Sequence, residues 1–171
     1  MRKPSLIVSR FFLLILLIGS TAVYSQPVSN GSAGALTVSG TQIVNTYGQV
    51  SNIITNSIGV YGSGFSPVVG DKVLLIQMTG ANTGKWQWVE VTGGGDPFMV
   101  SYSTNLSAFS TAYGGIIQAI LVPQYTSLTI PAGATLTAAP WNGTTGGILT
   151  FMVKNNFTIL PGGKCDVSGL G

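Results

Sequence analysis

The apolar residues of this chain fall in short runs that Gly or Pro interrupts, and no stretch after residue 34 shows the 3.6-residue period of a helix. Runs rich in β-branched and aromatic residues recur about every 8–12 residues, which is typical of an all-β sandwich or barrel. Strands are predicted over Ala35–Val38, Gln42–Val44, Asn52–Thr55, Ile58–Tyr61, Lys72–Met78, Lys85–Thr92, Phe98–Tyr102, Ile116–Val122 and Ile148–Val153. The core residues predicted from these runs include Val73, Leu75, Ile117, Leu121, Leu149 and Phe151.

A weak internal repeat lies near the C-terminus. Residues 128–137 (LTIPAGATLT) resemble residues 158–167 at an offset of 30 residues, which places a Pro on a Pro and a Gly on a Gly. A short strand, a Pro-Gly turn and a second short strand form the pattern of one β-helix coil. The predicted fold is therefore an antiparallel β-sandwich or barrel-like sheet that runs into the first coils of a β-helix-like C-terminal part.

The first 25 residues have the order of a secretory signal peptide. Three basic residues precede residue 11, the apolar run Phe11–Ile18 follows, and small residues come next. The run is shorter than the about 20 residues that a membrane span needs. Cleavage after Ser25 or after Ala22 fits, and we prefer Ser25. We expect a secreted, extracellular or outer cell-surface protein that meets a membrane through the transient signal peptide alone.

This reading divides the chain into four segments. They are a signal peptide (1–25), a flexible leader (26–34), a β domain (35–125) and an incomplete β-solenoid-like segment (126–171).

Charge and composition then exclude several function classes. Of seven basic residues, the four that follow the signal peptide balance four acidic residues, so the mature chain has no basic surface for nucleic acid or anionic lipid. The chain contains no His, which rules out Ser-His-Asp and Cys-His catalysis and the usual zinc sites. Among the carboxylates, Asp71 and Asp96 fit turns better than a glycosidase pair. We expect no enzyme, no catalytic residue, no metal and no cofactor.

Two side-chain features remain open to a functional interpretation. Alternation along the strand places Trp86, Trp88 and Glu90 on one face, where two indoles and a carboxylate could bind a sugar ring. The alternative is that the indoles belong to the core, where aromatic residues bury large areas. Cys165, the single cysteine, cannot form an intrachain disulfide, so it is either a buried small hydrophobe or a free reactive thiol. Its alternating surroundings favour the buried position.

Five short blocks of the sequence carry a resemblance when taken together: Asp71–Met78 (DKVLLIQM), Val122–Tyr125, Leu136–Gly143, Gly146–Leu149 and Asp166–Gly169. They resemble the N-terminal β module of large exported Gram-negative cell-surface proteins. The resemblance spans roughly residues 60–171, and it implies a module that leads into glycine-rich or β-helical repeats. It implies no ligand and no catalytic residue.

The expected function is that of a non-enzymatic, exported cell-surface module, structural or adhesin-like. The alternative is a carbohydrate-binding or polysaccharide-processing β-helix protein that lacks its catalytic part. The expected partners are neighbouring domains, further copies of the chain or surface glycans, and residues 148–171 are the predicted contact edge because they combine β-branched residues with few charges.

The signal-peptide interpretation predicts that the exported protein begins at Gln26, because Val23 and Ser25 fit the small-residue cleavage site. Intact-mass measurement of the exported form tests this. A mass that includes Phe11–Ile18 would contradict it.

Overall fold

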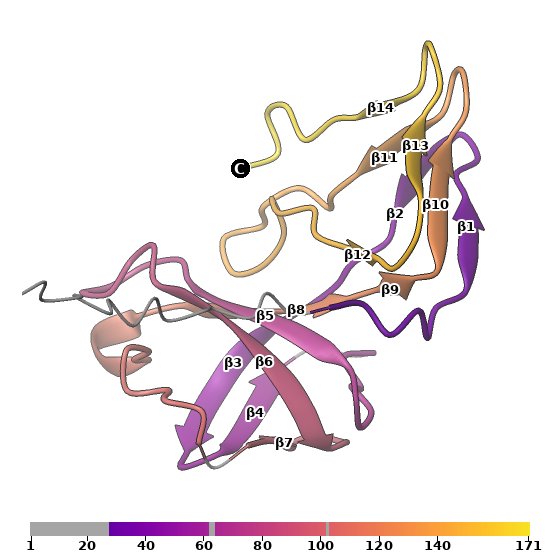
Figure 1. Cartoon of the computed structure of the whole chain (residues 1–171). Coiled ribbons are helices and arrows are strands. Elements are labelled where there is room, and N and C mark those ends of the chain that lie inside the picture. The colour runs from indigo at the N-terminus through magenta and orange to yellow at the C-terminus, as the bar shows by residue number, and fades with distance from the viewer. Residues whose placement is uncertain (1–27, 62–63, 102) are drawn as a thin grey trace, which may run out of the picture.

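The structure, a computed structural model, describes residues 28–61, 64–101 and 103–171 (Figure 1). The predicted signal peptide and the first residues of the leader, up to residue 27, lie outside these ranges. The regular elements of the described residues are β-strands and one 3₁₀ turn, η1 (Ala112–Gly114), and these residues contain no α-helix. The predicted all-β class is therefore confirmed.

Six strands form a closed antiparallel barrel, shown in the lower part of Figure 1. They are β3 (Thr46–Ile54), β4 (Ser57–Tyr61), β5 (Lys72–Gln77), β6 (Trp86–Gly93), β7 (Phe98–Val100) and β8 (Ile117–Val122). Their order around the barrel is β3-β4-β7-β6-β5-β8, and β8 returns to β3. Closure pairs every strand on both sides, which removes the exposed sheet edge.

Strand β5 shows why its sequence is apolar without interruption. Val73 and Leu75 point into the barrel and are completely buried. Leu74 and Ile76 point outward, where Leu74 joins a second apolar cluster with Ile120 and Ile76 packs against it. Both faces of this strand are covered, so the polar residues that a half-exposed strand would carry are missing.

The remaining strands run parallel to one another in three short ladders, which we call the parallel stack. The first ladder contains β1 (Ala35–Thr37), β10 (Ser127–Ile130) and β13 (Phe157–Ile159), in that order. The second contains β2 (Thr41–Ile43), β11 (Thr135–Thr137) and β14 (Lys164–Cys165), with β11 in the middle. The third pairs β9 (Gln124–Tyr125) with β12 (Met152–Val153). The stack thus has three layers, formed by residues 33–43, 124–137 and 152–165.

The register between the second and third layers corrects the predicted offset. Leu128 pairs with Phe157 and Leu136 with Cys165, an offset of 29 residues rather than 30. The apolar strand residues set this register, and the Gly133 N–H donates to the Gly162 carbonyl at 3.0 Å, which has the same offset. The prolines at the turns are consequently one position out of line. A shift of one residue would have turned the apolar side chains to the opposite face.

The barrel is inserted between the first and second layers of the stack. Residues 35–43, grouped above with the β domain, pair with the second layer, and the barrel begins at Thr46. The described part of the predicted leader also has fixed partners: the Ser29 hydroxyl donates to the Tyr125 carbonyl at 3.2 Å, and the Ala33 N–H donates to the Gln124 carbonyl at 2.9 Å.

Side-chain amides hold the segment between the second and third layers against the barrel. Gln118 of β8 donates to the Gly146 carbonyl at 3.2 Å and accepts from the Gly146 N–H. Asn45 binds Thr150 in the same two-sided way, donating at 2.6 Å and accepting at 3.0 Å. These amides take the place of a neighbouring strand. The predicted strand Ile148–Val153 is therefore reduced to Met152–Val153.

Gly146 is required at this contact. Its φ of 106° lies in the left-handed region, and a Cβ there would lie 2.2 Å from the Pro140 carbonyl oxygen.

The six residues predicted to lie in the core are all at least partly buried. Val73, Leu75 and Ile117 are completely buried in the barrel, and Leu121 is partly buried against the same cluster. Leu149 and Phe151 are partly buried and pack against the core of the stack.

Leu75→Ala should lower the free energy of unfolding by about 2–5 kcal/mol, because it leaves a cavity in a closed barrel. Ile54→Ala is the matched control: Ile54 lies in the same barrel but is 64% exposed, so its loss should be under about 0.5 kcal/mol. Urea unfolding of both variants measures the difference. Equal losses would show that the faces are assigned wrongly.

Candidate functional site

The predicted aromatic face lies on the outside of the barrel, and its two indoles differ in exposure. Trp88 is opposite Leu74 and packs against the cluster that also holds Ile120. Trp86, opposite Ile76, is 62% exposed. Glu90 pairs with Lys72 across the strand and forms an ion pair with its ammonium group. The core interpretation thus fits Trp88, while Trp86 stays open to solvent.

The carboxylates take part in separate local interactions. Asp71 accepts from the Val68 N–H at 2.8 Å, and Asp96 accepts from the Val60 N–H at 3.0 Å. Both bonds stabilise loops, as the turn interpretation predicts. Across the described ranges, no three His, Cys, Asp or Glu residues gather in a way that could hold a metal ion.

Three columns of side chains run through the parallel stack, one residue from each layer. Parallel strands in register place paired residues on the same face, and the central members Leu128, Ile130 and Leu136 are completely buried. The columns are Leu36–Leu128–Phe157, Val38–Ile130–Ile159 and Gln42–Leu136–Cys165. Val38 continues the ladder by one residue past Thr37, because its N–H donates to the Thr129 carbonyl at 2.9 Å.

The last member of each column is exposed. Phe157 and Ile159 are each 46% exposed, although the residues they pair with in the second layer are completely buried. Val167, two residues after Cys165 and beyond the end of β14, is 41% exposed. We call Phe157, Ile159, Cys165 and Val167 the open edge. Their exposure follows from position, because no further layer covers the third one in the described chain.

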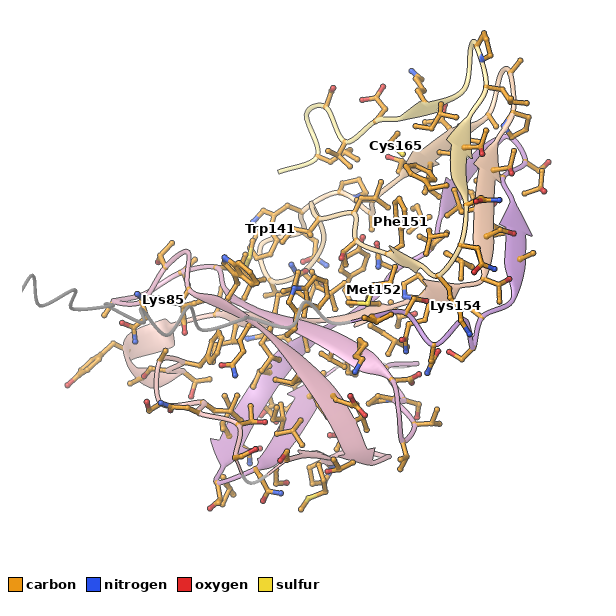
Figure 2. The ribbon with its side chains drawn as sticks, in the orientation of Figure 1. Lys85, Trp141, Phe151, Met152, Lys154 and Cys165 are labelled. Atoms are coloured by element: carbon orange, nitrogen blue, oxygen red, sulfur yellow. The ribbon has the colours of Figure 1, made fainter. Side chains whose placement is uncertain are left out.

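Cys165 corrects a prediction. The sequence predicted a buried thiol, and the structure shows an exposed one. The side chain does belong to an inward-facing column, next to the buried Leu136, but it lies in the last layer. Figure 2 shows Cys165 on the last layer, beyond Phe151 of the preceding segment. Desolvation by its neighbours still raises the pKa of the thiol.

Two opposite charges flank the open edge and bind each other. The Lys164 ammonium donates to the Asp166 carboxylate at 2.9 Å, and the Ser168 N–H donates to the same carboxylate at 3.0 Å. The bond from Lys164 and then the bond from Ser168 lower the pKa of Asp166 from 3.8 to about 2. Because the folded-state pKa is the lower one, the ionised carboxylate stabilises the fold above pH 3.8, and this contribution is lost as the pH falls toward 2. The pair is solvated, so its contribution is small. At neutral pH the edge carries no net charge from this pair.

A hollow of about 350 Å³ lies between the barrel and the first two layers of the stack. Val44, Asp71 and Gln124 are among its lining residues. The Gln124 amide is already satisfied, since it accepts from the Asn30 N–H and donates to the Gly70 carbonyl, both at 3.1 Å. Every buried side-chain nitrogen and oxygen in the described ranges has a partner.

Sequence reasoning missed the first layer of the stack. The signal was present as the repeated triplets Leu36-Thr37-Val38, Leu128-Thr129-Ile130 and Phe157-Thr158-Ile159, each with an apolar residue on both sides of a Thr. The strands of the barrel separate the first triplet from the other two, which hides the repeat from a search for a fixed period.

No family model matches the chain, and no curated protein or solved structure matches it either. Among the residues that the structure describes, no helix has the length and apolar character needed to span a membrane.

The exposure of Cys165 predicts that N-ethylmaleimide modifies it completely in the folded protein at low concentration. The rate should rise with pH above 7, because the thiolate is the reactive form and the pKa is raised. Mass spectrometry in buffer and in urea measures the two rates. Reaction in urea alone would show that the thiol is covered.

Proposed function

We propose that the chain is a non-enzymatic, exported cell-surface module, structural or adhesin-like, that acts through contact at its open edge. The observation that carries this proposal is the contrast within single columns: Leu128 and Ile130 are completely buried, while their partners Phe157 and Ile159 are 46% exposed. An exposed apolar group of this kind on a sheet edge is typical of an interaction site.

The charge distribution supports the same proposal. Native proteins commonly protect an exposed edge with charged residues, above all Lys. Here Lys164 is engaged by Asp166, and Phe157, Ile159 and Cys165 are uncharged. The edge therefore lacks the repulsion that would keep another strand away.

The proposed location outside the cell rests on the signal-peptide pattern and on the resemblance to Gram-negative surface modules. In such modules the stack would be the beginning of a β-helix-like region. A structural module of this kind needs no catalytic residue, which agrees with the absence of His from the sequence.

Binding of a surface glycan at Trp86 is the second candidate, because this indole is 62% exposed on the outer face of the barrel. This candidate predicts a tryptophan fluorescence change on titration of the native chain with cellohexaose or xylan, and Trp86→Ala should abolish it while leaving contact at the open edge unaffected. No change in the native chain would contradict it.

Ile159→Lys should lower the fraction of exported chain retained on the producing cells by about tenfold, because it would place an unpaired charge in the contact, at a cost above about 1.4 kcal/mol. Thr158→Lys is the matched control, since it adds the same charge on the same strand but on the opposite face. Quantitative blotting of cells and medium measures retention. Equal retention of the native chain and Ile159→Lys would refute the proposed function.

A further inference from the structure

We propose that the hollow between the barrel and the stack binds an ammonium group carried on an aliphatic chain, with Asp71 as its counter-ion. The hollow lies where β8 leads from the barrel into β9 of the stack (Figure 1). Sites for small ligands commonly occur at such junctions between substructures. The proposal goes beyond the contact function of the open edge, because none of the described residues that line the hollow belongs to the third layer.

The walls of the hollow are mainly hydrocarbon. Val44, Val68, Leu121, Val122 and Pro123 all line it. Its volume of about 350 Å³ lies at the lower end of the range of about 300–1,000 Å³ that small-ligand sites have. Such walls favour a ligand with a short aliphatic part, because the contact removes apolar surface from water.

A single carboxylate gives the hollow its charge. Among the described residues that line it, Asp71 alone is ionisable. In the described chain Asp71 takes part in no ion pair, and Lys72, its neighbour in sequence, is paired with Glu90 instead. One carboxylate oxygen of Asp71, Oδ2, accepts from the Val68 N–H. The other oxygen, Oδ1, is therefore available to a cationic ligand.

Hydrogen bonds hold Asp71 in place before a ligand arrives. Its backbone N–H donates to the Val68 carbonyl at 3.0 Å, and its backbone carbonyl accepts from the Val91 N–H at 2.9 Å. The carboxylate bond to the Val68 N–H, at 2.8 Å, fixes the side chain to the same turn. Because the carboxylate is already positioned, little affinity is lost to the ordering of the site.

Gln124 of β9 connects the walls of the hollow. Its amide nitrogen donates to the carbonyl of Gly70, next to Asp71, and its amide oxygen accepts from the Asn30 N–H, both at 3.1 Å. Its backbone carbonyl accepts from the Ala33 N–H at 2.9 Å. These bonds join the first and second layers of the stack to the loop that carries Asp71, so the hollow has a defined shape without a ligand.

The lining favours a primary amine over a metal ion or an anion. Ca²⁺ takes about six to eight oxygen ligands, whereas this hollow combines one carboxylate with mainly apolar walls. An anion would be repelled by Asp71. An ammonium group carries several N–H donors, and Ser32 and Thr46, which both line the hollow, have hydroxyl groups that accept such donors. The ligand is therefore a primary aliphatic amine, either free or as the side chain of a lysine.

Titration with n-pentylamine at neutral pH, followed in amide NMR spectra of the chain that begins at Gln26, tests the site. The amide signals of Ala33 and Val122 should shift and saturate. The neutral analogue n-pentanol should bind about tenfold more weakly, because it has no charge to pair with Asp71. A third ligand, Nα-acetyl-lysine methylamide, carries the same ammonium group on a peptide unit. Its binding would extend the ligand class to lysine side chains, and its failure beside n-pentylamine binding would restrict the class to free amines.

Asp71→Asn should weaken the binding of n-pentylamine by about tenfold, while its amide oxygen can still accept from the Val68 N–H. Asp96→Asn is the matched control. Asp96 also accepts one backbone N–H, from Val60 at 3.0 Å, but it is not among the residues that line the hollow. Its loss of charge should change the affinity by less than about twofold, because salt screens charges outside the site.

Three results would overturn the inference. They are the absence of a saturable shift with n-pentylamine, equal affinities for n-pentylamine and n-pentanol, and unchanged binding in Asp71→Asn. The comparison of the two ligands needs the native chain alone, so it decides the question if Asp71→Asn does not fold. Retention of Ile159→Lys on cells depends on none of the residues that line the hollow, so this inference and the proposed function fail separately.

Discussion

A β-strand inside a sheet has hydrogen-bonding partners on both sides, whereas a strand at the edge leaves half of its backbone N–H and C=O groups unpaired. In the parallel stack, β10 and β11 have a strand on each side, and β13 and β14 have one on a single side. The side-chain columns also lose a contact at β13 and β14, because a further layer would supply both the backbone hydrogen bonds and the packed side chains. The open edge, with Phe157, Ile159 and Cys165 exposed, lies on strands that have a neighbour on one side only.

The barrel and the stack differ in whether their strands keep unpaired backbone groups. The barrel closes on itself, and each of its strands has two neighbours. The stack has no such closure, and it is joined to the barrel through side-chain amides. Gln118 and Asn45 bind both the N–H and the carbonyl of one residue in the segment that leads to the third layer. Each amide thus supplies the two hydrogen bonds that a neighbouring strand would otherwise make.

Local pattern predicted the elements better than their partners. The apolar run Lys72–Met78 was predicted as a strand, and the structure forms β5 there, because the signal lies within the run. The thiol of Cys165 was placed wrongly, since alternation identifies the face on which a residue lies but not whether another layer covers that face. The pairing of Leu36 with Leu128 depends on a contact across the whole barrel, which no local window contains. For the site, the sequence predicted residues 148–171 as a contact edge, and the structure adds which of their side chains are exposed at the end of the side-chain columns.

Amide hydrogen exchange of the chain that begins at Gln26 tests the central claim most directly, because it compares the layers within one molecule. The account predicts that the amides of β10 and β11 are protected at every concentration. Those of β13 and β14 that face away from the second layer, such as the Ile159 N–H, should exchange rapidly in dilute solution and slowly when the chain associates. Equal protection of the second and third layers in dilute solution, unchanged by concentration, would contradict an open edge.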